Sequence, residues 1–212
     1  MAPYPKSEKS AAQIVAAATR VLARQGYART SLLDIAKEAG MSKGALHYHF
    51  PTKESLVAKV LETALGTVAE RTLSAWERSS GDPFQAIRSG IRELWEVRRN
   101  RTDEVAVIAD LLAQSLYDEG LRPQIADYYR TAASQVNERL LPALRMLGLR
   151  PKVQPELVPR ILVGLLDGLV MQHFADPDAI DSEGLVQAVE SMATGLFELA
   201  PPAPPQSSGP VS

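Results

Sequence analysis

The sequence predicts an all-α protein made of a three-helix head, which carries a helix-turn-helix, and a six-helix body. Apolar residues recur at helical spacing along almost the whole chain. Strand-like alternation bounded by Asn-Gly or Asp-Gly turns is not found. The breaks between the helical segments fall at N-cap residues, glycines and prolines, which start and stop helices.

The composition is that of a soluble globular protein without cysteine chemistry. The chain has 212 residues, of which 45% are hydrophobic, and it has no cysteine. Disulfides, thiolate metal sites and cysteine nucleophiles are therefore excluded. We expect neither a membrane span nor a signal peptide, because no run of eighteen apolar residues occurs and the N-terminus lacks an apolar segment. A cytoplasmic protein fits these features best.

The net charge of −2 conceals an uneven distribution. Residues 1–55 contain eight Lys or Arg against four Asp or Glu, a net +4, whereas the remainder contains fifteen against twenty-one, a net −6. A basic module on an acidic body suits a duplex-binding head, because neutralising phosphates supplies much of the affinity for DNA.

The chain divides into four predicted parts. Residues 1–9 are expected to form a flexible arm, whose two lysines either reach DNA phosphates or are merely solvated. Residues 10–52 form the helix-turn-helix domain, and residues 53–200 form a helical regulatory and dimerisation domain. Residues 201–212 are rich in Pro and Ser, which predicts a disordered tail.

Two helices and a tight turn are predicted to precede the third helix of the head. The first helix runs from about Ser10 to Gln25 and ends at Gly26. Ser31 is a good N-cap for the second helix, and Asp34 stands three residues on, close to a capping box. Gly40 supplies the positive φ that the end of this helix favours.

The third helix, from Lys43 to about His49, has two unlike faces. Ser42 is its predicted N-cap. Leu46 and Phe50 are four residues apart and point toward the small core of the head. The opposite face is predicted to be exposed and carries small residues, a tyrosine and flanking basic side chains.

We expect this exposed face to enter the major groove of DNA. The second helix of a helix-turn-helix places its N-terminal residues at base edges, and here they are Lys43, Gly44 and Ala45. The lysine can donate to guanine acceptors, and the small residues allow close approach. Tyr48 can pack on sugar or on a thymine methyl group, while phosphate contacts fix the register. The predicted DNA contacts are Thr30, Ser31, Ser42, Lys43, Gly44, Ala45, His47, Tyr48, His49 and Lys53.

At these residues the chain resembles the tetracycline-repressor (TetR) family of bacterial regulators. The resemblance covers roughly residues 10–60 and implies nine helices, DNA binding and usually a ligand pocket. One departure is His47, where the family usually carries tyrosine, which affects one expected backbone contact. The matching residues are Gly26-Tyr27, Thr30-Ser31, Asp34-Ile35-Ala36, Ala39-Gly40-Met41-Ser42, Gly44, Leu46, Tyr48-His49-Phe50 and Lys53-Glu54.

Six further helices are predicted in the body. The longest begins after the N-cap Thr52 and runs from Lys53 to about Ser79, which gives it a length of roughly 40 Å. Pro142 is expected to kink or interrupt a later helix. The remaining helices are predicted at about 83–99, 102–117, 121–147, 158–174 and 182–199.

The last two predicted helices carry more apolar surface than one chain readily buries. The first of them is apolar around most of its circumference, and Gly164 and Gly168 would let another helix approach closely. A second copy of the pair would form an isologous four-helix interface, and a wholly intrachain bundle is the alternative. A two-fold dimer would place two reading helices about 34–36 Å apart on a palindromic site. The predicted interface residues are Leu162, Leu165, Leu169, Val189, Met192 and Leu196.

Aromatic and polar residues among the leucines and valines of the body suggest a ligand pocket. Such pockets are mostly apolar, with a few placed polar groups. In the alternative interpretation the aromatic residues belong to the core and the polar groups pair internally, so the pocket is mainly an implication of the resemblance. The candidates are Trp76, Trp95, Asp110, Gln114, Tyr117, Tyr128 and His173.

These features favour a ligand-released repressor that acts as a homodimer. A ligand that prefers one tilt of the long helix would change the separation of the two heads, and so the affinity for DNA. An effector-independent DNA-binding regulator and a plain helical interaction module are the alternatives. Catalysis is not expected, because His47 and His49 diverge around a helix and Gly-rich phosphate loops and a Gly-x-Ser-x-Gly elbow are missing. We expect no cofactor and no metal.

Overall fold

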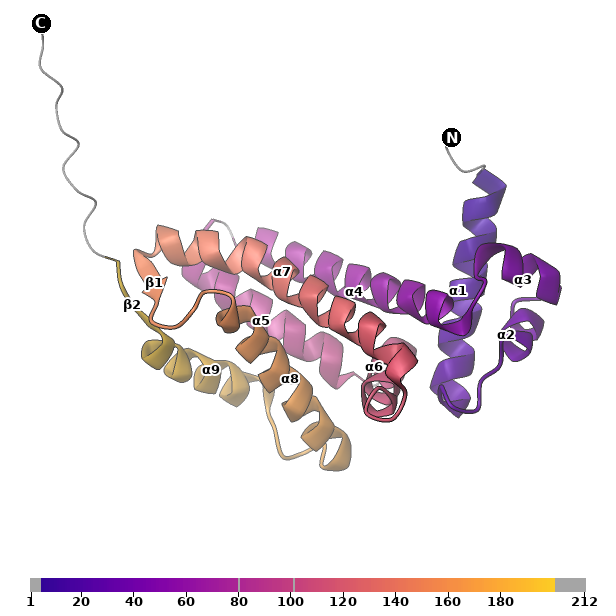
Figure 1. Cartoon of the computed structure of the whole chain (residues 1–212). Coiled ribbons are helices and arrows are strands. Elements are labelled where there is room, and N and C mark those ends of the chain that lie inside the picture. The colour runs from indigo at the N-terminus through magenta and orange to yellow at the C-terminus, as the bar shows by residue number, and fades with distance from the viewer. Residues whose placement is uncertain (1–4, 80, 101, 201–212) are drawn as a thin grey trace, which may run out of the picture.

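The computed structural model describes residues 5–79, 81–100 and 102–200, and within them it confirms the all-α class (Figure 1). The predicted tail and the first four residues of the predicted arm lie outside the described residues. The described part contains nine α-helices, one short 3-10 helix and two short strands. Their bounds are α1 Pro5–Gln25, α2 Leu32–Glu38, α3 Lys43–His49, α4 Lys53–Glu77, α5 Pro83–Arg99, α6 Asp103–Gln114, η1 Glu119–Leu121, α7 Arg122–Met146, β1 Leu149–Pro151, α8 Leu157–Ala175, α9 Ser182–Leu196 and β2 Phe197–Leu199.

The first three helices form a head at one end of the molecule, and the strands lie at the other end (Figure 1). The prediction that α1 begins at Ser10 is wrong, because it begins at Pro5 and takes in half of the predicted arm. Proline is tolerated in the first turn of a helix, because a backbone N–H at that position would have no acceptor within the helix. The end of α1 is as predicted, since Gly26 follows it with a φ of +77°.

Helix caps set most of the boundaries in the first half of the chain. Ser31 and Asp34 form a complete capping box at the start of α2. A second capping box joins Thr52 and Ser55 at the start of α4. Asp82 accepts hydrogen bonds from the first backbone N–H groups of α5. Each cap satisfies donors that a helix N-terminus otherwise leaves unpaired.

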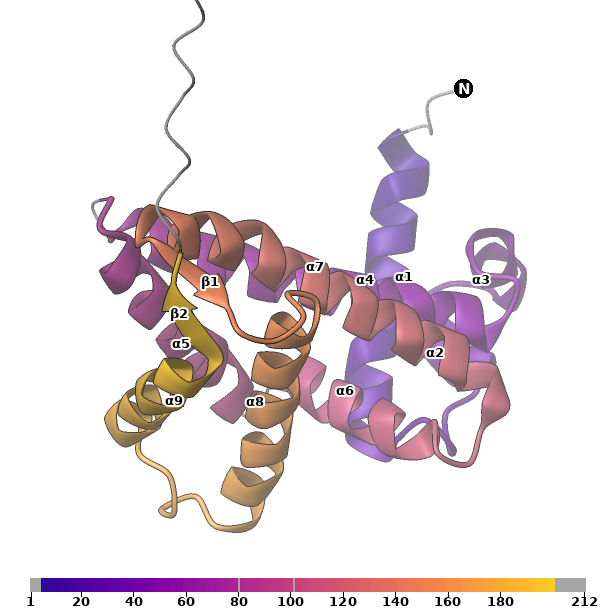
Figure 2. The same ribbon diagram turned by 60° about the vertical axis from the view of Figure 1, so that its left-hand side comes forward.

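The long helix α4 connects the head to the body. Its 25 residues span about 38 Å. Figure 1 shows α7 alongside it, and α5 packs against its second half. Gly90 of α5 lies at this contact, where an added Cβ would meet the ring of Trp76 at 3.4 Å. In Figure 2, α9 lies on the side of the body away from the head, and α8 lies between α9 and α6.

Helix α7 contains Pro142 without interruption. The sequence-based expectation allowed either a kink or a break at this residue. Because proline has no N–H, the helix loses one backbone hydrogen bond, to the carbonyl oxygen of Glu138, about one turn before its end. The helix therefore continues to Met146.

The two strands are the main departure from the predicted secondary structure. Leu149–Pro151 pairs with Phe197–Leu199 in an antiparallel ladder, and Arg150 forms an ion pair of 2.7 Å with Glu198 across it. As a result α9 ends at Leu196 rather than at Leu199. Strands of three residues are too short for alternation to reveal them.

The larger of two apolar core clusters runs from the head into the body. Residues from α1 to α4 share one buried cluster with residues from α6, α7 and α8. A second cluster surrounds Trp95, between α5, α8 and α9. A head of about fifty residues has little core of its own, so burial against α6 supports it.

Candidate functional site

Helices α2 and α3 form the predicted helix-turn-helix. Gly40 has a φ of +65° in the turn between them, where nothing lies within 4 Å of an added Cβ. Conformation rather than space therefore favours glycine at this position. Ser42 then caps α3 by accepting a hydrogen bond of 3.1 Å from the backbone N–H of Ala45. Both features agree with the sequence-based prediction.

Helix α3 buries one face and leaves the other open to solvent. Leu46 is completely buried and Phe50 nearly so, as predicted. Lys43, Gly44 and Ala45 are all exposed at the start of the helix. The side chain of Tyr48 is 80% exposed, and its ring packs edge-on against His49 with the ring centres 5.2 Å apart.

The ten predicted DNA contacts differ in how open they are. Six of them are exposed, and the two histidines, His47 and His49, are half-buried. The Nδ1 atom of His47 lies 3.3 Å from the carbonyl oxygen of Pro51. The six exposed residues are Ser31, Ser42, Lys43, Gly44, Ala45 and Tyr48.

The side chains of Thr30 and Lys53 make contacts within the head, and their contacts with DNA stay a prediction. Thr30 is buried and donates a hydrogen bond of 2.7 Å to the carbonyl oxygen of Gly26. Lys53 donates to the carbonyl oxygen of Tyr27, and its ammonium group lies 3.7 Å from the centre of the Tyr27 ring. Burial lowers the pKa of Lys53, against the opposing effect of nearby carboxylates.

Sequence reasoning missed two exposed cations beside the helix-turn-helix. Arg29 stands in the loop before α2, and Lys37 lies on α2 itself. Two other arginines of the head, Arg20 and Arg24, are occupied in ion pairs with Glu38. The basic character of the sequence in and around the motif could have drawn attention to Arg29 and Lys37. Only the fold shows which cations of the head are exposed and which are held in ion pairs.

The junction between head and body is built around Tyr27. Its backbone N–H donates a hydrogen bond of 2.6 Å to the carboxylate of Asp110 on α6. Burial, followed by the carboxylates of Asp118 and Glu54, raises the pKa of Tyr27 to about 12. Asp110 was predicted to lie in a ligand pocket, but the structure places it at this junction. The head therefore contacts the body through α6 as well as through α4.

The body contains an apolar cavity of about 280 Å³. Helices α4, α5, α7, α8 and α9 contribute to its wall. The aromatic residues of the wall are Trp76, Phe84 and Phe197, and the charged ones are Arg88, Arg98, Arg139 and Glu190. A mostly apolar cavity with a few polar groups is typical of a small-molecule site.

Of the seven predicted ligand-binding residues, only Trp76 lines this cavity. Tyr117 is 87% exposed, because α6 ends at Gln114 and the chain turns away. Tyr128 is buried in the main core, and burial raises its pKa to about 12. Gln114 is half-buried at the end of α6 and contributes nothing to the cavity wall.

The other two predicted ligand-binding residues, Trp95 and His173, pack against each other outside the cavity. Their ring centres are 5.6 Å apart in an edge-on arrangement. Trp95 is completely buried, and its indole N–H donates to the hydroxyl of Ser182 at 3.2 Å. Trp95 belongs to the second core cluster, as the alternative interpretation of the aromatic residues held. His173 departs from that interpretation, because its Nδ1 atom is buried without a hydrogen-bond partner among the described residues.

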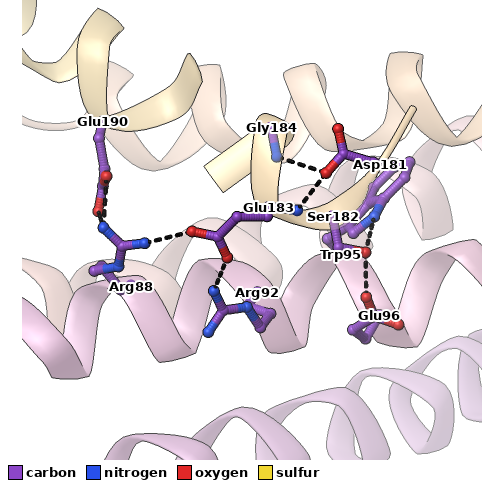
Figure 3. Close-up of polar contacts among 9 residues, drawn as sticks. All are labelled: Arg88, Arg92, Trp95, Glu96, Asp181, Ser182, Glu183, Gly184 and Glu190. Carbon is purple, nitrogen blue, oxygen red and sulfur yellow. Dashed lines mark hydrogen bonds and ion pairs between the residues drawn. The ribbon is translucent and has the colours of Figure 1, made fainter. Parts of the chain in front are cut away.

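A polar network fixes α9 to α5 beside the cavity (Figure 3). Arg88 pairs with Glu183 at 2.9 Å and with Glu190 at 2.8 Å, and Arg92 also contacts Glu183. The hydroxyl of Ser182 donates to Glu96. These contacts hold the position of α9, and with it one wall of the cavity. Asp181 begins the helix by accepting from the backbone N–H groups of Glu183 and Gly184.

The outward face of α8 differs from the predicted interface. Leu162, Leu165, Val189, Met192 and Leu196 all line the cavity, and Leu169 is half-buried against the second core cluster. Met192 is 48% exposed as well, so it alone of the six is largely open to solvent. The solvent-facing side of α8 carries the apolar and small residues Leu157, Ile161, Gly164, Gly168 and Met171, flanked by the exposed polar residues Arg160 and Gln172. Nothing lies within 4 Å of a Cβ added at either glycine.

By length and composition alone, α8 is a candidate membrane span. This finding qualifies the expectation drawn from the absence of a long apolar run. The helix packs against α5 and α7, and it carries Asp167, which pairs with Arg98 at 3.2 Å. We therefore interpret α8 as a bundle helix with one apolar face left over.

Comparison with known proteins assigns both parts of the chain. Residues 14–60 match the family described as bacterial regulatory proteins, tetR family. Residues 83–198 match the description BetI-type transcriptional repressor, C-terminal. No group of three or more His, Cys, Asp or Glu residues suited to a metal ion occurs in the described part of the chain.

Full-length similarity supports the same assignment. The regulator TtgR of Pseudomonas putida is 24% identical over 92% of this chain and 95% of its own length. The regulator LmrA of Bacillus subtilis is 33% identical over 60% of this chain and 69% of its own length. The crystal structure of a transcriptional regulator from Pseudomonas aeruginosa PAO1 shares the fold, with a TM-score of 0.73, 22% identity and coverage of 89% of this chain and 90% of that one. The chain thus belongs to the TetR family, whose members are DNA-binding transcriptional regulators and not enzymes.

Proposed function

We propose that this chain is a cytoplasmic homodimeric repressor that leaves a palindromic operator when a small, largely apolar effector binds in the body. The observation that carries the proposal is the position of α4. Its first turns pack in the core of the head, and its later turns line the cavity. A single rigid helix thus contacts both the expected DNA-binding unit and the expected effector site.

The outward face of α8 supports the homodimer. An exposed row of apolar and small residues on a helix is unusual for a monomer and typical of an interface. The open glycines allow two α8 helices to approach closely, and α9 extends the contact. A two-fold axis there would give each operator half-site one copy of α3, with centres about 34–36 Å apart.

The exposed face of α3 supports direct reading of bases. Lys43 forms no ion pair among the described residues, so its ammonium group is available to an acceptor on DNA. Gly44 and Ala45 leave the helix backbone free to approach a groove wall. Tyr48 then has a function for its exposed ring.

The cavity supports regulation by an effector. Coupling of about 1–3 kcal/mol between cavity and operator would change DNA affinity by about 5–150-fold. Helix α6 offers a second connection, through the bond between Asp110 and Tyr27. The effector-independent alternative is a DNA-binding regulator that uses the same head and whose operator affinity no ligand of the cavity changes.

Selection of bound sequences from random duplex DNA tests the DNA-binding part of the proposal. We expect the protein to enrich a palindrome, and Lys43→Ala to relax the base preference at one position by about 1–3 kcal/mol. Tyr48→Phe tests the hydroxyl separately. Lys152→Ala is the matched control, because this exposed lysine directly follows β1, which lies at the opposite end of the molecule from the head (Figure 1).

Each outcome of the selection has a clear meaning. Uniform weakening across all sequences in Lys43→Ala would identify a phosphate contact instead of a base contact. A monomeric protein that ignores DNA at low ionic strength would contradict the whole proposal. Operator affinity that stays constant while the cavity is saturated would leave only the effector-independent alternative.

A further inference from the structure

The arginines of the cavity wall differ in how their charge is balanced. Arg88 lies between Glu183 and Glu190, and all three groups belong to the network that holds α9 (Figure 3). Arg98 pairs with Asp167 of α8 and also donates to the carbonyl oxygen of Leu94. Both charges are compensated within the chain, so neither needs a ligand.

Arg139 is the exception. Its guanidinium donates one hydrogen bond, of 2.9 Å, to the carbonyl oxygen of Gln135 on its own helix. Among the residues that the structure describes, no carboxylate forms an ion pair with it. The side chain is half-buried and belongs to the cavity wall, together with Gln135 one turn earlier on α7.

An uncompensated guanidinium beside an apolar cavity has a strong preference for one class of ligand. It stays protonated under all ordinary conditions. Its remaining N–H groups can bind a carboxylate in a two-pronged arrangement, which is stronger than a neutral hydrogen bond. Because Arg139 contributes a single uncompensated charge, a monoanion balances it, whereas a dianion would introduce an unpaired charge.

The rest of the wall specifies the remainder of the ligand. The apolar part of the cavity wall consists mainly of leucine, valine and isoleucine side chains, and it includes the rings of Trp76 and Phe84. An apolar body would bury its surface there at about 25 cal/mol per Å². Glu190 belongs to the same wall, but Arg88 already neutralises it, so a cationic ligand finds no free counter-charge.

We propose that the effector is an amphipathic monocarboxylate whose apolar body fills the cavity and whose carboxylate binds Arg139, an inference that rests on the proposed effector function. Arg139 then determines specificity for the anion. Gln135 is placed to donate its side-chain amide to the same group.

Three ten-carbon probes with different head groups test this inference. Sodium decanoate, decanol and decylamine are titrated, below the micelle-forming concentration, into the full chain without DNA and followed by calorimetry. The fluorescence of Trp76, which lines the cavity, gives a second reading. We expect decanoate to bind saturably and at least about tenfold more tightly than either of the other two probes.

Variants at position 139 locate the carboxylate. Arg139→Gln is expected to weaken decanoate binding by about tenfold or more and to leave decanol binding unchanged. Arg139→Lys should retain part of the preference. Arg145→Gln is the matched control, because Arg145 is an exposed arginine on the same helix that lies outside the cavity wall.

The outcomes separate this inference from the proposed function. Absence of saturable decanoate binding, equal or tighter binding of decanol or decylamine, or unchanged decanoate affinity in Arg139→Gln would each overturn the monocarboxylate class. Such a result would leave open release of DNA by another ligand. Decanoate that binds through Arg139 without changing operator affinity would confirm the ligand class and contradict the release mechanism.

Discussion

The head and the body differ in where they leave a charge without a partner. In the head, Lys43 extends from an exposed helix face into solvent, while the core beneath it is filled by Leu46. In the body, the charged groups on α9 are paired, and of the described arginines in the cavity wall Arg139 is the one without a carboxylate partner. The head is thus suited to a large anion that approaches from outside, and the body to a small one that enters it.

The head and the body also differ in how completely their interiors are packed. In the head, the short helices α2 and α3 each have a side-chain N-cap and pack over a filled core that continues into the body. The body encloses empty volume and leaves an apolar stripe on α8 uncovered. In the head, one helix, α3, carries both the buried residue Leu46 and the exposed residue Lys43. In the body, the cavity and the exposed stripe of α8 are separate features.

The largest expected effect comes from blocking the exposed stripe of α8, where we expect a second copy of the chain to bind. Gly168→Arg places a long charged side chain where the proposed second copy approaches, while arginine favours the helix more than glycine does. We expect a folded monomer whose operator affinity is lower by about 10²–10⁴-fold, because the two heads are no longer linked. Light scattering and a DNA-binding titration measure both quantities.

Gly66→Arg is the control for this substitution. Gly66 lies on α4, and nothing lies within 4 Å of a Cβ added there. The variant should remain a dimer. A Gly168→Arg protein that stays dimeric would show that copies associate through another face.

The second prediction compares packing in the two regions directly. Leu46→Ala removes a fully buried side chain from the closed core of the head and should cost about 2–5 kcal/mol of unfolding free energy. Leu140→Ala removes a half-buried side chain that already faces the cavity, so fewer contacts are lost and the cost should be smaller. Urea unfolding followed by circular dichroism measures both. Equal costs would mean that the cavity collapses in solution.

The head could be predicted from the sequence because local rules determine it. Ser31, Gly40 and Ser42 act within four residues of where they stand, and the spacing of Leu46 and Phe50 identifies the buried face. The exceptions there are long-range. Lys53 is occupied by Tyr27, which lies 26 residues away in the turn after α1, and no pattern around either residue indicates that contact.

The site in the body could not be predicted in the same way. Trp76, Trp95 and Tyr117 look alike in sequence, but one lines the cavity, one fills the core and one is exposed. Their positions depend on how the helices pack and where α6 ends. Arg139 gave no signal, because its distinction is the lack of a partner, which only the positions of distant carboxylates establish.

The third prediction concerns the connection between the two regions. Asp110→Ala removes the acceptor of the Tyr27 N–H and should cost about 1–3 kcal/mol, since a partly buried donor loses its partner. The change in operator affinity caused by the effector should also shrink, because α6 no longer holds the head. Gln114→Ala, one turn later on α6, is the control, and chemical unfolding together with DNA titration gives the readout. A coupling that survives Asp110→Ala would assign transmission to α4 alone.

The smallest expected effect concerns the capping box of the head and the dependence of its stabilising effect on pH. The hydroxyl of Ser31 donates a hydrogen bond of 2.6 Å to the carboxylate of Asp34. This bond is the largest of the effects that lower the pKa of Asp34 below its ordinary value. A lowered pKa stabilises the fold above the ordinary value of about 4, and the stabilisation disappears as the pH falls through the lowered pKa. Ser31→Ala should therefore destabilise the protein more at pH 7 than near pH 3.

Ser42→Ala provides the comparison within the same motif. Ser42 caps α3, but the first turn of that helix has no acidic residue to return a hydrogen bond. Loss of either cap should cost about 0.5–2 kcal/mol at neutral pH. Only the cost of Ser31→Ala should decrease in acid, as urea unfolding at the two pH values would measure. If both costs fell equally, titration elsewhere in the chain, and not the capping box, would govern the acid sensitivity of the head.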